Sequence, residues 1–242
     1  MFKVMIRDNM SPVAREILEA TGKIEVVEDF DKTTNAPERL AEIIGDFHGL
    51  ALRSGTKVNE TVLAQATNLK AIGRAGAGVN NIPVPRMSAR GIPVFNAPGA
   101  NANAVKELVL AGMLMAARNI AQAWGFARGL SGDDARINAE VEQGKKKFVG
   151  FELPGRTLGV IGLGAIGVQV ANAARALGMK VVGYDPTITV QRAWQLESDV
   201  QQALSVDDLL SRVDFVSFHV PLTEDTKHMI NAARIRLMKK GA

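Results

Sequence analysis

Three glycines at a fixed spacing are the feature of this sequence with the most specific chemistry. They are Gly162, Gly164 and Gly167 in the segment GLGAIG. In the pattern GxGxxG the first glycine permits a tight turn, the second lets the backbone approach a pyrophosphate, and the third lets a helix pack closely on a strand. A helix that begins there directs free N–H groups at the phosphates. Taken alone, the three glycines are also compatible with a tight turn that binds nothing.

An acidic residue follows this loop at the distance that a dinucleotide site requires. Asp185 ends the next predicted strand, 18 residues after Gly167. A carboxylate at that position accepts hydrogen bonds from ribose hydroxyls and repels a 2′-phosphate. The combination predicts an NAD site and disfavours NADP. The alternative is that Asp185, which precedes Pro186, is only a turn residue.

Two arginines could bind an anion. Arg53 and Arg74 each end a predicted strand, and α/β sheets place their ligand crevices at the carboxyl ends of strands. A guanidinium group there suits a carboxylate or a phosphate. Ser54 and the backbone N–H of Gly76 are weaker candidates on the same rim. The alternative for either arginine is a surface ion pair.

Short apolar runs alternate with segments of helical period, which predicts an α/β fold with parallel sheets. A boundary near residues 98–99 divides a first domain, 1–98, from a second, 99–242. Asn35 and Glu38 resemble a capping box for the second predicted helix. The expected strands are 3–7, 24–27, 49–52, 69–73, 93–96, 157–161, 180–184 and 214–218. The expected helices are 12–22, 36–44, 59–66, 102–122, 166–177, 206–212 and 232–238, and a long surface loop is expected over 129–155.

Composition narrows the classes of protein to which the chain can belong. The chain has 242 residues, 47% apolar and 22% charged, which is typical of a globular protein. The absence of cysteine excludes disulfides, thiol catalysis and cysteine-ligated zinc, and we expect no metal site. The 29 basic residues are interleaved with 25 acidic ones, so the net charge of +4 predicts no nucleic-acid partner. Without a signal peptide or an apolar run of about 18 residues, we expect no membrane partner and a cytoplasmic protein.

Several segments together resemble one known family. They are RSGTKV at 53–58, GRAGAGVNNI at 73–82, NAPGAN at 96–101, the glycine loop, and HVPLT at 219–223. The chain resembles the D-isomer-specific 2-hydroxyacid dehydrogenases over residues 1–242. The segments GRAG at 73–76 and KKF at 146–148 point to the branch whose substrate is 3-phosphoglycerate.

The resemblance implies two Rossmann-like or flavodoxin-like domains, a substrate-binding domain and an NAD-binding domain, the second of them incomplete. It also implies a homodimer or higher oligomer that forms through the helix at 102–122. The implied contacts to a small, phosphorylated 2-hydroxy acid are Arg53, Ser54, Arg74, Gly76, Asn101 and Lys145. The implied contacts to NAD are Ala77, Gly162, Gly164, Ala165, Ile166, Gly167, Asp185, His219, Val220 and Pro221.

Some of these residues depart from the family pattern or have a simpler explanation. Ala165 replaces an arginine of many relatives, and Ala77 and Val220 replace threonines. Lys145 stands where relatives have an arginine that reaches a neighbouring subunit. Asn101 could equally cap the helix that follows it.

The implied activity is the NAD-dependent oxidation of D-3-phosphoglycerate to 3-phosphohydroxypyruvate, the first step of L-serine biosynthesis. The family's catalytic arginine, glutamate and histidine are expected beyond Ala242, so no catalytic residue is assigned and we expect the chain as given to be inactive. Two alternatives remain. One is a sister activity, such as glyoxylate/hydroxypyruvate reduction or D-lactate oxidation. The other is an NAD-binding dimerisation module without catalysis.

Overall fold

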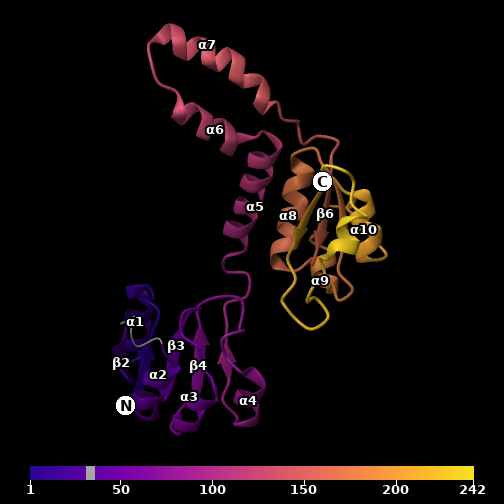
Figure 1. Cartoon of the computed structure of the whole chain (residues 1–242). Helices are drawn as coiled ribbons and strands as arrows, with labels where there is room; N and C mark the ends of the chain where they lie inside the picture. The colour runs from indigo at the N-terminus through magenta and orange to yellow at the C-terminus, as the bar shows by residue number, and fades with distance from the viewer. Residues whose placement is uncertain (31–35) are drawn as a thin grey trace. The chain divides into compact units, whose positions relative to one another are not determined.

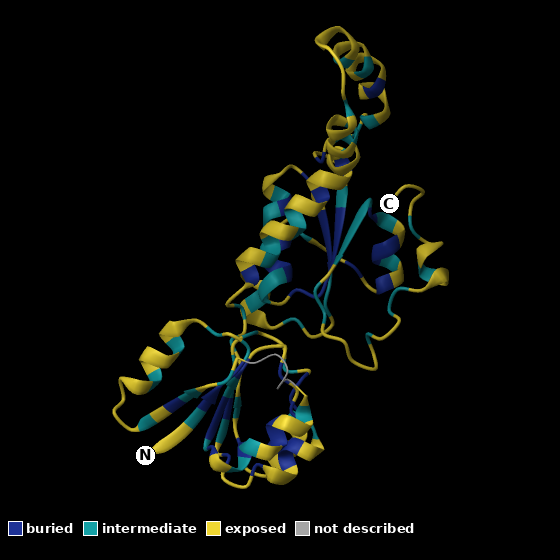
Figure 2. Ribbon diagram, turned by 60° about the vertical axis from the view of Figure 1, so that its left-hand side comes forward, coloured by how far each residue is buried: buried dark blue, intermediate teal, exposed yellow. Residues whose placement is uncertain are grey.

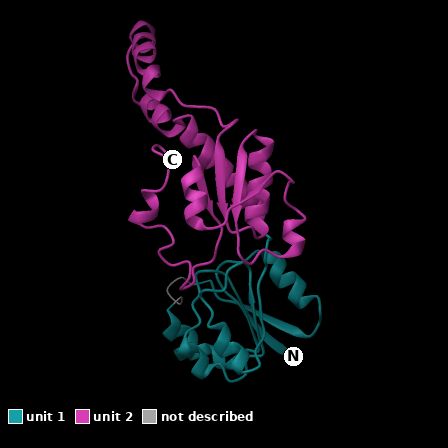
Figure 3. Ribbon diagram, turned by 90° about the vertical axis from the view of Figure 1, so that its right-hand side faces the viewer, with its two compact units in different colours: residues 1–101 teal, residues 102–242 magenta. Residues whose placement is uncertain are grey.

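The computed structural model describes residues 1–30 and 36–242, which form two compact units, Met1–Asn101 and Ala102–Ala242 (Figure 3). Each unit contains one parallel sheet with helices as crossovers. The α/β class expected from the sequence is therefore confirmed. No helix among the described residues is long and apolar enough to cross a membrane.

The first unit is a five-stranded sheet in the order β2-β1-β3-β4-β5 (Figure 1). This is the flavodoxin-like order, 2-1-3-4-5. Its strands are β1 (Phe2–Ile6), β2 (Ile24–Glu28), β3 (Gly49–Leu52), β4 (Ala71–Arg74) and β5 (Val94–Phe95). Its helices are α1 (Pro12–Glu19), α2 (Pro37–Ile43), α3 (Glu60–Gln65) and α4 (Val84–Ala89), with a 3-10 turn, η2 (Ile44–Asp46).

One apolar core holds this sheet in place. Alternate strand residues and the inner faces of α2, α3 and α4 are buried together (Figure 2). The main contributors are Met5, Leu40, Leu50, Leu52, Val62, Ile72 and Met87. Because burial of such side chains supplies most of the stabilisation of a domain, this core fixes the carboxyl ends of β3 and β4.

The second unit is a four-stranded sheet in the order β8-β7-β6-β9. Numbered within the unit, the order is 3-2-1-4, which is the beginning of the Rossmann order. Its strands are β6 (Thr157–Ile161), β7 (Lys180–Tyr184), β8 (Gln201–Gln202) and β9 (Phe215–Phe218). Its helices are α5 (Ala102–Ala117), α6 (Ile120–Gly129), α7 (Asp134–Gly144), α8 (Ala165–Ala176), α9 (Val190–Ala193), α10 (Val206–Arg212) and α11 (Ala232–Ile235), with a 3-10 turn, η3 (Lys145–Phe148).

Both faces of the second sheet are covered. Val160 belongs to the core shared with α5 and α8, and its neighbour Ile161 belongs to the core shared with α10. Successive side chains of a strand point to opposite faces, so a nearly continuous apolar run in β6 indicates this two-sided burial. The direction of winding changes between β6 and β9, and open α/β sheets bind ligands at such a point.

The prediction of a single helix over 102–122 is wrong. The chain forms α5 and α6, separated at Asn119, whose φ of 51° lies in the left-handed region. Asn119 Nδ2 donates to the carbonyl oxygen of Val149 at 3.1 Å, and the N–H of Phe151 donates to the carbonyl oxygen of Ala117 at 2.9 Å. These contacts from a distant segment end α5, and local periodicity cannot reveal them.

The prediction of a long surface loop over 129–155 is also wrong, because α7 and η3 lie within this range. Asp133 caps α7 by accepting a hydrogen bond from the N–H of Arg136 at 2.9 Å, and Arg136 pairs with Glu140 one turn later. The ring of Phe126 in α6 packs against Phe148 at a centroid distance of 5.3 Å. The glycines and charges of this segment suggested a loop, but the cap and the aromatic contact stabilise helices.

The remaining differences are small. Three short elements, α4, α9 and β8, were not expected, and α11 ends at Ile235 rather than at residue 238. The helix expected over 36–44 is present as α2. Asn35, the proposed capping residue, lies outside the described residues.

Candidate functional site

The glycine loop lies between β6 and α8, at the point where the strand order reverses. Gly162 has a φ of +91°, which glycine adopts without strain. A Cβ on Gly162 would lie 2.8 Å from the backbone carbonyl carbon of His219, and a Cβ on Gly167 would overlap the carbonyl oxygen of Gly162. The first and third glycines are therefore required by close packing of the loop, β9 and α8.

Gly164 differs from these two glycines because, apart from its two chain neighbours, no atom lies within 4 Å of the position that its Cβ would take. It is exposed and occupies the N-cap position of α8, where no side chain caps the helix. The N–H of Val168 is the first of α8 to bond within the helix, to the carbonyl oxygen of Gly164 at 3.1 Å. The preceding N–H groups are the donors that a helix start offers to an anion. Space and donors thus suit a pyrophosphate.

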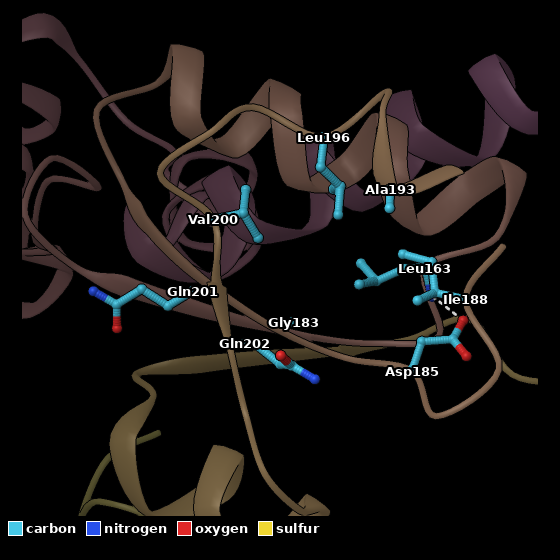
Figure 4. Close-up of a pocket in the computed structure, with 9 residues that line it drawn as sticks. All are labelled: Leu163, Gly183, Asp185, Ile188, Ala193, Leu196, Val200, Gln201 and Gln202. Atoms are coloured by element: carbon cyan, nitrogen blue, oxygen red, sulfur yellow. Dashed lines mark hydrogen bonds between the residues drawn. The ribbon is translucent and has the colours of Figure 1, made fainter. Parts of the chain in front are cut away.

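Asp185 is held toward the glycine loop by three hydrogen bonds. Its Oδ2 accepts from the N–H of Leu163 at 2.8 Å (Figure 4). Its Oδ1 accepts from the N–H of Thr187 at 2.9 Å and from the Thr187 hydroxyl at 3.1 Å. The carboxylate is half-buried, so part of it remains accessible to ligand hydroxyls. Asp185 both closes a turn and faces the loop.

Neither Leu163 nor Thr187 was singled out from the sequence. The segment Asp-Pro-Thr is a signal for Thr187, because aspartate commonly accepts from the residue two positions later. Leu163 carries no such signal, because its bond to Asp185 joins residues of two different strand ends.

A cavity of about 200 Å³ lies beside Asp185, on the face of the sheet that α8 covers. Aliphatic side chains of Leu163, Ile188, Leu196 and Val200 line it (Figure 4). Asp185 is the charged residue among those that line it. The wall beside this carboxylate is therefore largely aliphatic, with Gln201 and Gln202 as its other polar residues.

The segment His219–Pro221 continues from β9 and lies against the glycine loop. The N–H of His219 donates to the carbonyl oxygen of Ile161 at 2.8 Å, and its Nε2 shares a hydrogen bond with the hydroxyl of Ser217 at 2.9 Å. Burial lowers the pKa of His219 from the usual 6.5. The imidazole is therefore neutral near pH 7, and it is held by Ser217.

The first unit contains the two arginines at neighbouring strand ends. Leu52 is paired with Arg74 in the register of β3 and β4, so Arg53 and Arg74 lie at the same edge of the sheet. Among the described residues, the side chains of Arg53 and Ser54 have no hydrogen-bond partner, and both residues are exposed. These groups are open to an anion.

Arg74 is partly engaged by its own loop. Its Nη1 donates to the carbonyl oxygen of Gly78, and its Nε is buried without a partner in the part of the chain that the structure describes. The guanidinium group lies over Gly76 and Gly78, where side chains would crowd it. The N–H of Gly76, expected to face substrate, donates to the carbonyl oxygen of Arg74 at 2.9 Å.

The other predicted contacts are dispersed. Lys145 lies in η3 and pairs with Glu142 at 2.5 Å. The carbonyl oxygen of Ala77 accepts from Asn96 Nδ2 at 2.7 Å in the first unit, and Asn101 is the exposed last residue of that unit. Their roles at a substrate or cofactor stay predictions.

A family model described as "D-isomer specific 2-hydroxyacid dehydrogenase, NAD binding domain" matches residues 110–242, more than half of the chain. The chain belongs to this family. Residues 110–242 therefore form its NAD-binding domain, and NAD is the cofactor. The open space at Gly164, the free helix start and the oriented Asp185 all fit that dinucleotide.

Two curated relatives match over almost the whole chain. The D-3-phosphoglycerate dehydrogenase of Methanocaldococcus jannaschii is 44% identical over 243 residues, which are 100% of this chain and 43% of that protein. The hydroxypyruvate reductase of Thermotoga maritima is 38% identical, over 99% of this chain and 72% of that protein. The chain thus spans less than half the length of the first of these relatives.

A solved structure supports the same family. The NAD⁺-bound 3-phosphoglycerate dehydrogenase of Entamoeba histolytica is 29% identical and matches with a TM-score of 0.72. The match covers 98% of this chain and 68% of that one. Both units thus have counterparts in that dehydrogenase.

Proposed function

We propose that this chain takes part in the NAD-dependent oxidation of D-3-phosphoglycerate to 3-phosphohydroxypyruvate, the first step of L-serine biosynthesis. The observation that carries the proposal is the pair Arg53 and Arg74 at adjacent strand ends. The substrate is a small molecule with a carboxylate and a phosphate, and guanidinium groups bind both through paired hydrogen bonds. The resemblance to D-3-phosphoglycerate dehydrogenases supports the same substrate.

Each unit has a separate task in this proposal. The second unit would hold NAD⁺, which would supply the hydride acceptor for oxidation of the hydroxy acid. The start of α8 binds the pyrophosphate, and Asp185 accepts hydrogen bonds from the ribose hydroxyls. The guanidinium groups of Arg53 and Arg74, in the first unit, would hold the anionic groups of the substrate. We assign no residue of this chain as the base.

The second candidate function is reduction of an unphosphorylated 2-keto acid. The hydroxypyruvate reductase of T. maritima, of which this chain covers 72%, favours it. An unphosphorylated substrate needs one anion contact fewer, so the two candidates differ in their dependence on Arg74.

The deciding experiment measures binding of D-3-phosphoglycerate and of D-glycerate to NADH-loaded protein by titration calorimetry. We expect the wild type to prefer the phosphorylated ligand. Loss of hydrogen bonds to a charged group should make Arg74→Ala about 10- to 100-fold weaker for D-3-phosphoglycerate. We expect a much smaller loss for D-glycerate.

Arg86→Ala is the matched control. Arg86 forms an exposed ion pair with Glu60 at 2.9 Å, and such pairs contribute little to stability, so we expect its affinities to equal those of the wild type. Equal losses on both ligands in Arg74→Ala would contradict the phosphoglycerate assignment. A protein that binds NADH but neither of the two acids would favour the alternative of an NAD-binding dimerisation module without catalysis.

We also propose that the protein is a cytoplasmic homo-oligomer that associates through α5 and α6. Although α5 packs on α8 through Met113 and Ala117, Leu108 is 73% exposed. In α6, Trp124 is 61% exposed. Large apolar side chains exposed on these two consecutive helices support an interface there.

A further inference from the structure

A side chain from the end of β1 holds the segment Arg53–Thr56, which carries two of the proposed anion contacts. Asp8 Oδ2 accepts from the N–H of Arg53 at 2.7 Å and from the N–H of Thr56 at 3.0 Å. Asp8 Oδ1 accepts from the hydroxyl of Thr56 at 2.8 Å. One carboxylate therefore binds both ends of the segment with charge-assisted hydrogen bonds, which are stronger than neutral ones.

Asn81 completes this arrangement from the other side. Its Nδ2 donates to the carbonyl oxygen of Arg53 at 2.7 Å and to that of Thr56 at 2.6 Å. Asn81 is only 9% exposed. Its amide orientation is determined, because an oxygen in place of Nδ2 would face two carbonyl oxygens. The backbone N–H and C=O of both Arg53 and Thr56 are thus bonded to two side chains.

The backbone around Asp8 is unusual. Asp8 and Asn9 have φ values of +63° and +49°, in the left-handed region. Aspartate and asparagine tolerate this conformation better than other residues with side chains, but it remains uncommon. Such conformations concentrate where the surrounding structure holds them for a functional purpose. The pairing of Ile6 with Ala51 brings this turn beside the end of β3.

The side chains within the segment are free while its backbone is fixed. Arg53 and Ser54 are exposed and have no side-chain partner in the described ranges, 1–30 and 36–242. Thr56 is 1% exposed and anchors the segment in the core. A loop that is ordered before the ligand arrives loses less conformational entropy on binding. This organisation suits recognition of a small anion.

We propose that Asp8 and Asn81 are positioning residues that hold the Arg53–Thr56 loop in its anion-binding conformation. The inference rests on the proposed function, because it takes the anion to be the 2-hydroxy acid substrate. The charge of Asp8 by itself opposes an anion nearby. Asp8 can therefore favour anion binding only through the geometry of the loop. Removal of its charge should then weaken anion binding, whereas a purely electrostatic effect would strengthen it.

The test compares Asp8→Asn with Asp46→Asn, which makes the same charge change at an exposed residue of η2. D-3-phosphoglycerate is titrated into NADH-loaded protein by calorimetry. Because an amide cannot accept all three hydrogen bonds, we expect Asp8→Asn to bind about tenfold more weakly or worse. We expect Asp46→Asn to match the wild type, and NADH affinity to be equal in all three. A simple charge effect would strengthen binding in Asp8→Asn.

A second pair of variants keeps the inference testable if Asp8→Asn fails to fold. Thr56→Val removes one hydrogen bond to Asp8 with little change of shape, and Thr56→Ser keeps it. We expect Thr56→Val to bind about threefold more weakly and Thr56→Ser to match the wild type. Unchanged binding in both Asp8→Asn and Thr56→Val would overturn the positioning role. A wild type that binds NADH but no D-3-phosphoglycerate would instead overturn the proposed function.

Discussion

The carboxylate of Asp185 and the backbone N–H of Leu163 are joined by a hydrogen bond of 2.8 Å. Leu163 lies between the first two glycines of the loop, so this bond links the end of β7 to the glycine turn after β6. One residue therefore contacts both strand ends of the proposed dinucleotide site: it orients the loop, and we propose that its remaining lone pair accepts a hydrogen bond from the ribose.

Asp185→Asn should weaken NADH binding and relax discrimination against NADPH. The amide offers one acceptor oxygen where the carboxylate offers two, and it no longer repels a 2′-phosphate. We expect NADH affinity to fall about tenfold, with a smaller change for NADPH. Fluorescence titration of the two cofactors measures both. Asp134→Asn, at an exposed position in α7, is the control. An unchanged affinity ratio would contradict the assignment.

Alanine at the second and at the third glycine of the loop should affect different properties, NADH binding and stability respectively. Gly167→Ala places a methyl group against the carbonyl oxygen of Gly162, which is backbone and cannot move away. We expect its free energy of unfolding to fall by about 2 kcal/mol or more. Gly164→Ala meets no protein atom, so its stability should change by less than about 1 kcal/mol while NADH binding weakens. Urea unfolding and NADH titration separate these effects, and tight NADH binding by Gly164→Ala would contradict the pyrophosphate site.

His219 should make the stability of the protein depend on pH. Burial lowers its pKa below the usual 6.5 in the folded state. Between the two pKa values the unfolded chain binds more protons, so the free energy of unfolding falls as the pH falls below 6.5. Above that pH we expect His219 to make its full contribution to the free energy of unfolding. In His219→Gln we expect the free energy of unfolding to depend less steeply on pH.

Unfolding by urea from about pH 8 to about pH 5 measures this dependence. His228→Asn is the control, because His228 is exposed and its φ of 55° is one that asparagine tolerates. A pH dependence that is the same in His219→Gln as in the wild type would show that another group titrates in this range.

Leu108→Glu should weaken self-association if α5 forms the interface. A charge in the centre of an apolar contact is desolvated without a partner, and we expect the dimer to dissociate at about tenfold higher concentration or above. Sedimentation velocity measures this. Leu204→Glu introduces the same charge at a residue that is 88% exposed outside α5 and α6. Equal association of both variants and the wild type would place the interface elsewhere.

The α/β class and the NAD site could be predicted from the sequence because their signals are local. The strands at 49–52, 157–161 and 180–184 were expected with the bounds that β3, β6 and β7 have. Glycine spacing, strand period and a carboxylate at the right distance depend on residues close together in the chain. The periodicity of helices and strands relates such neighbours directly, without reference to the rest of the fold.

Tertiary contacts decided what local patterns could not. The break between α5 and α6 at Asn119 depends on its contact with Val149. The expected loop instead contains α7 and the turn η3, which packs on α6. Asp8 lies in no motif, and the segment at 73–82 that contains Asn81 does not reveal its partner. Folding nevertheless brings Asp8 and Asn81 to Arg53 from 45 and 28 residues away.

The sequence by itself determined which residues could bind a dinucleotide and an anion, because those residue types carry the chemistry. Only the tertiary structure decided which groups hold them in place. Long-range hydrogen bonds depend on the sheet register that brings distant strand ends together, and that register is set by packing of the whole core.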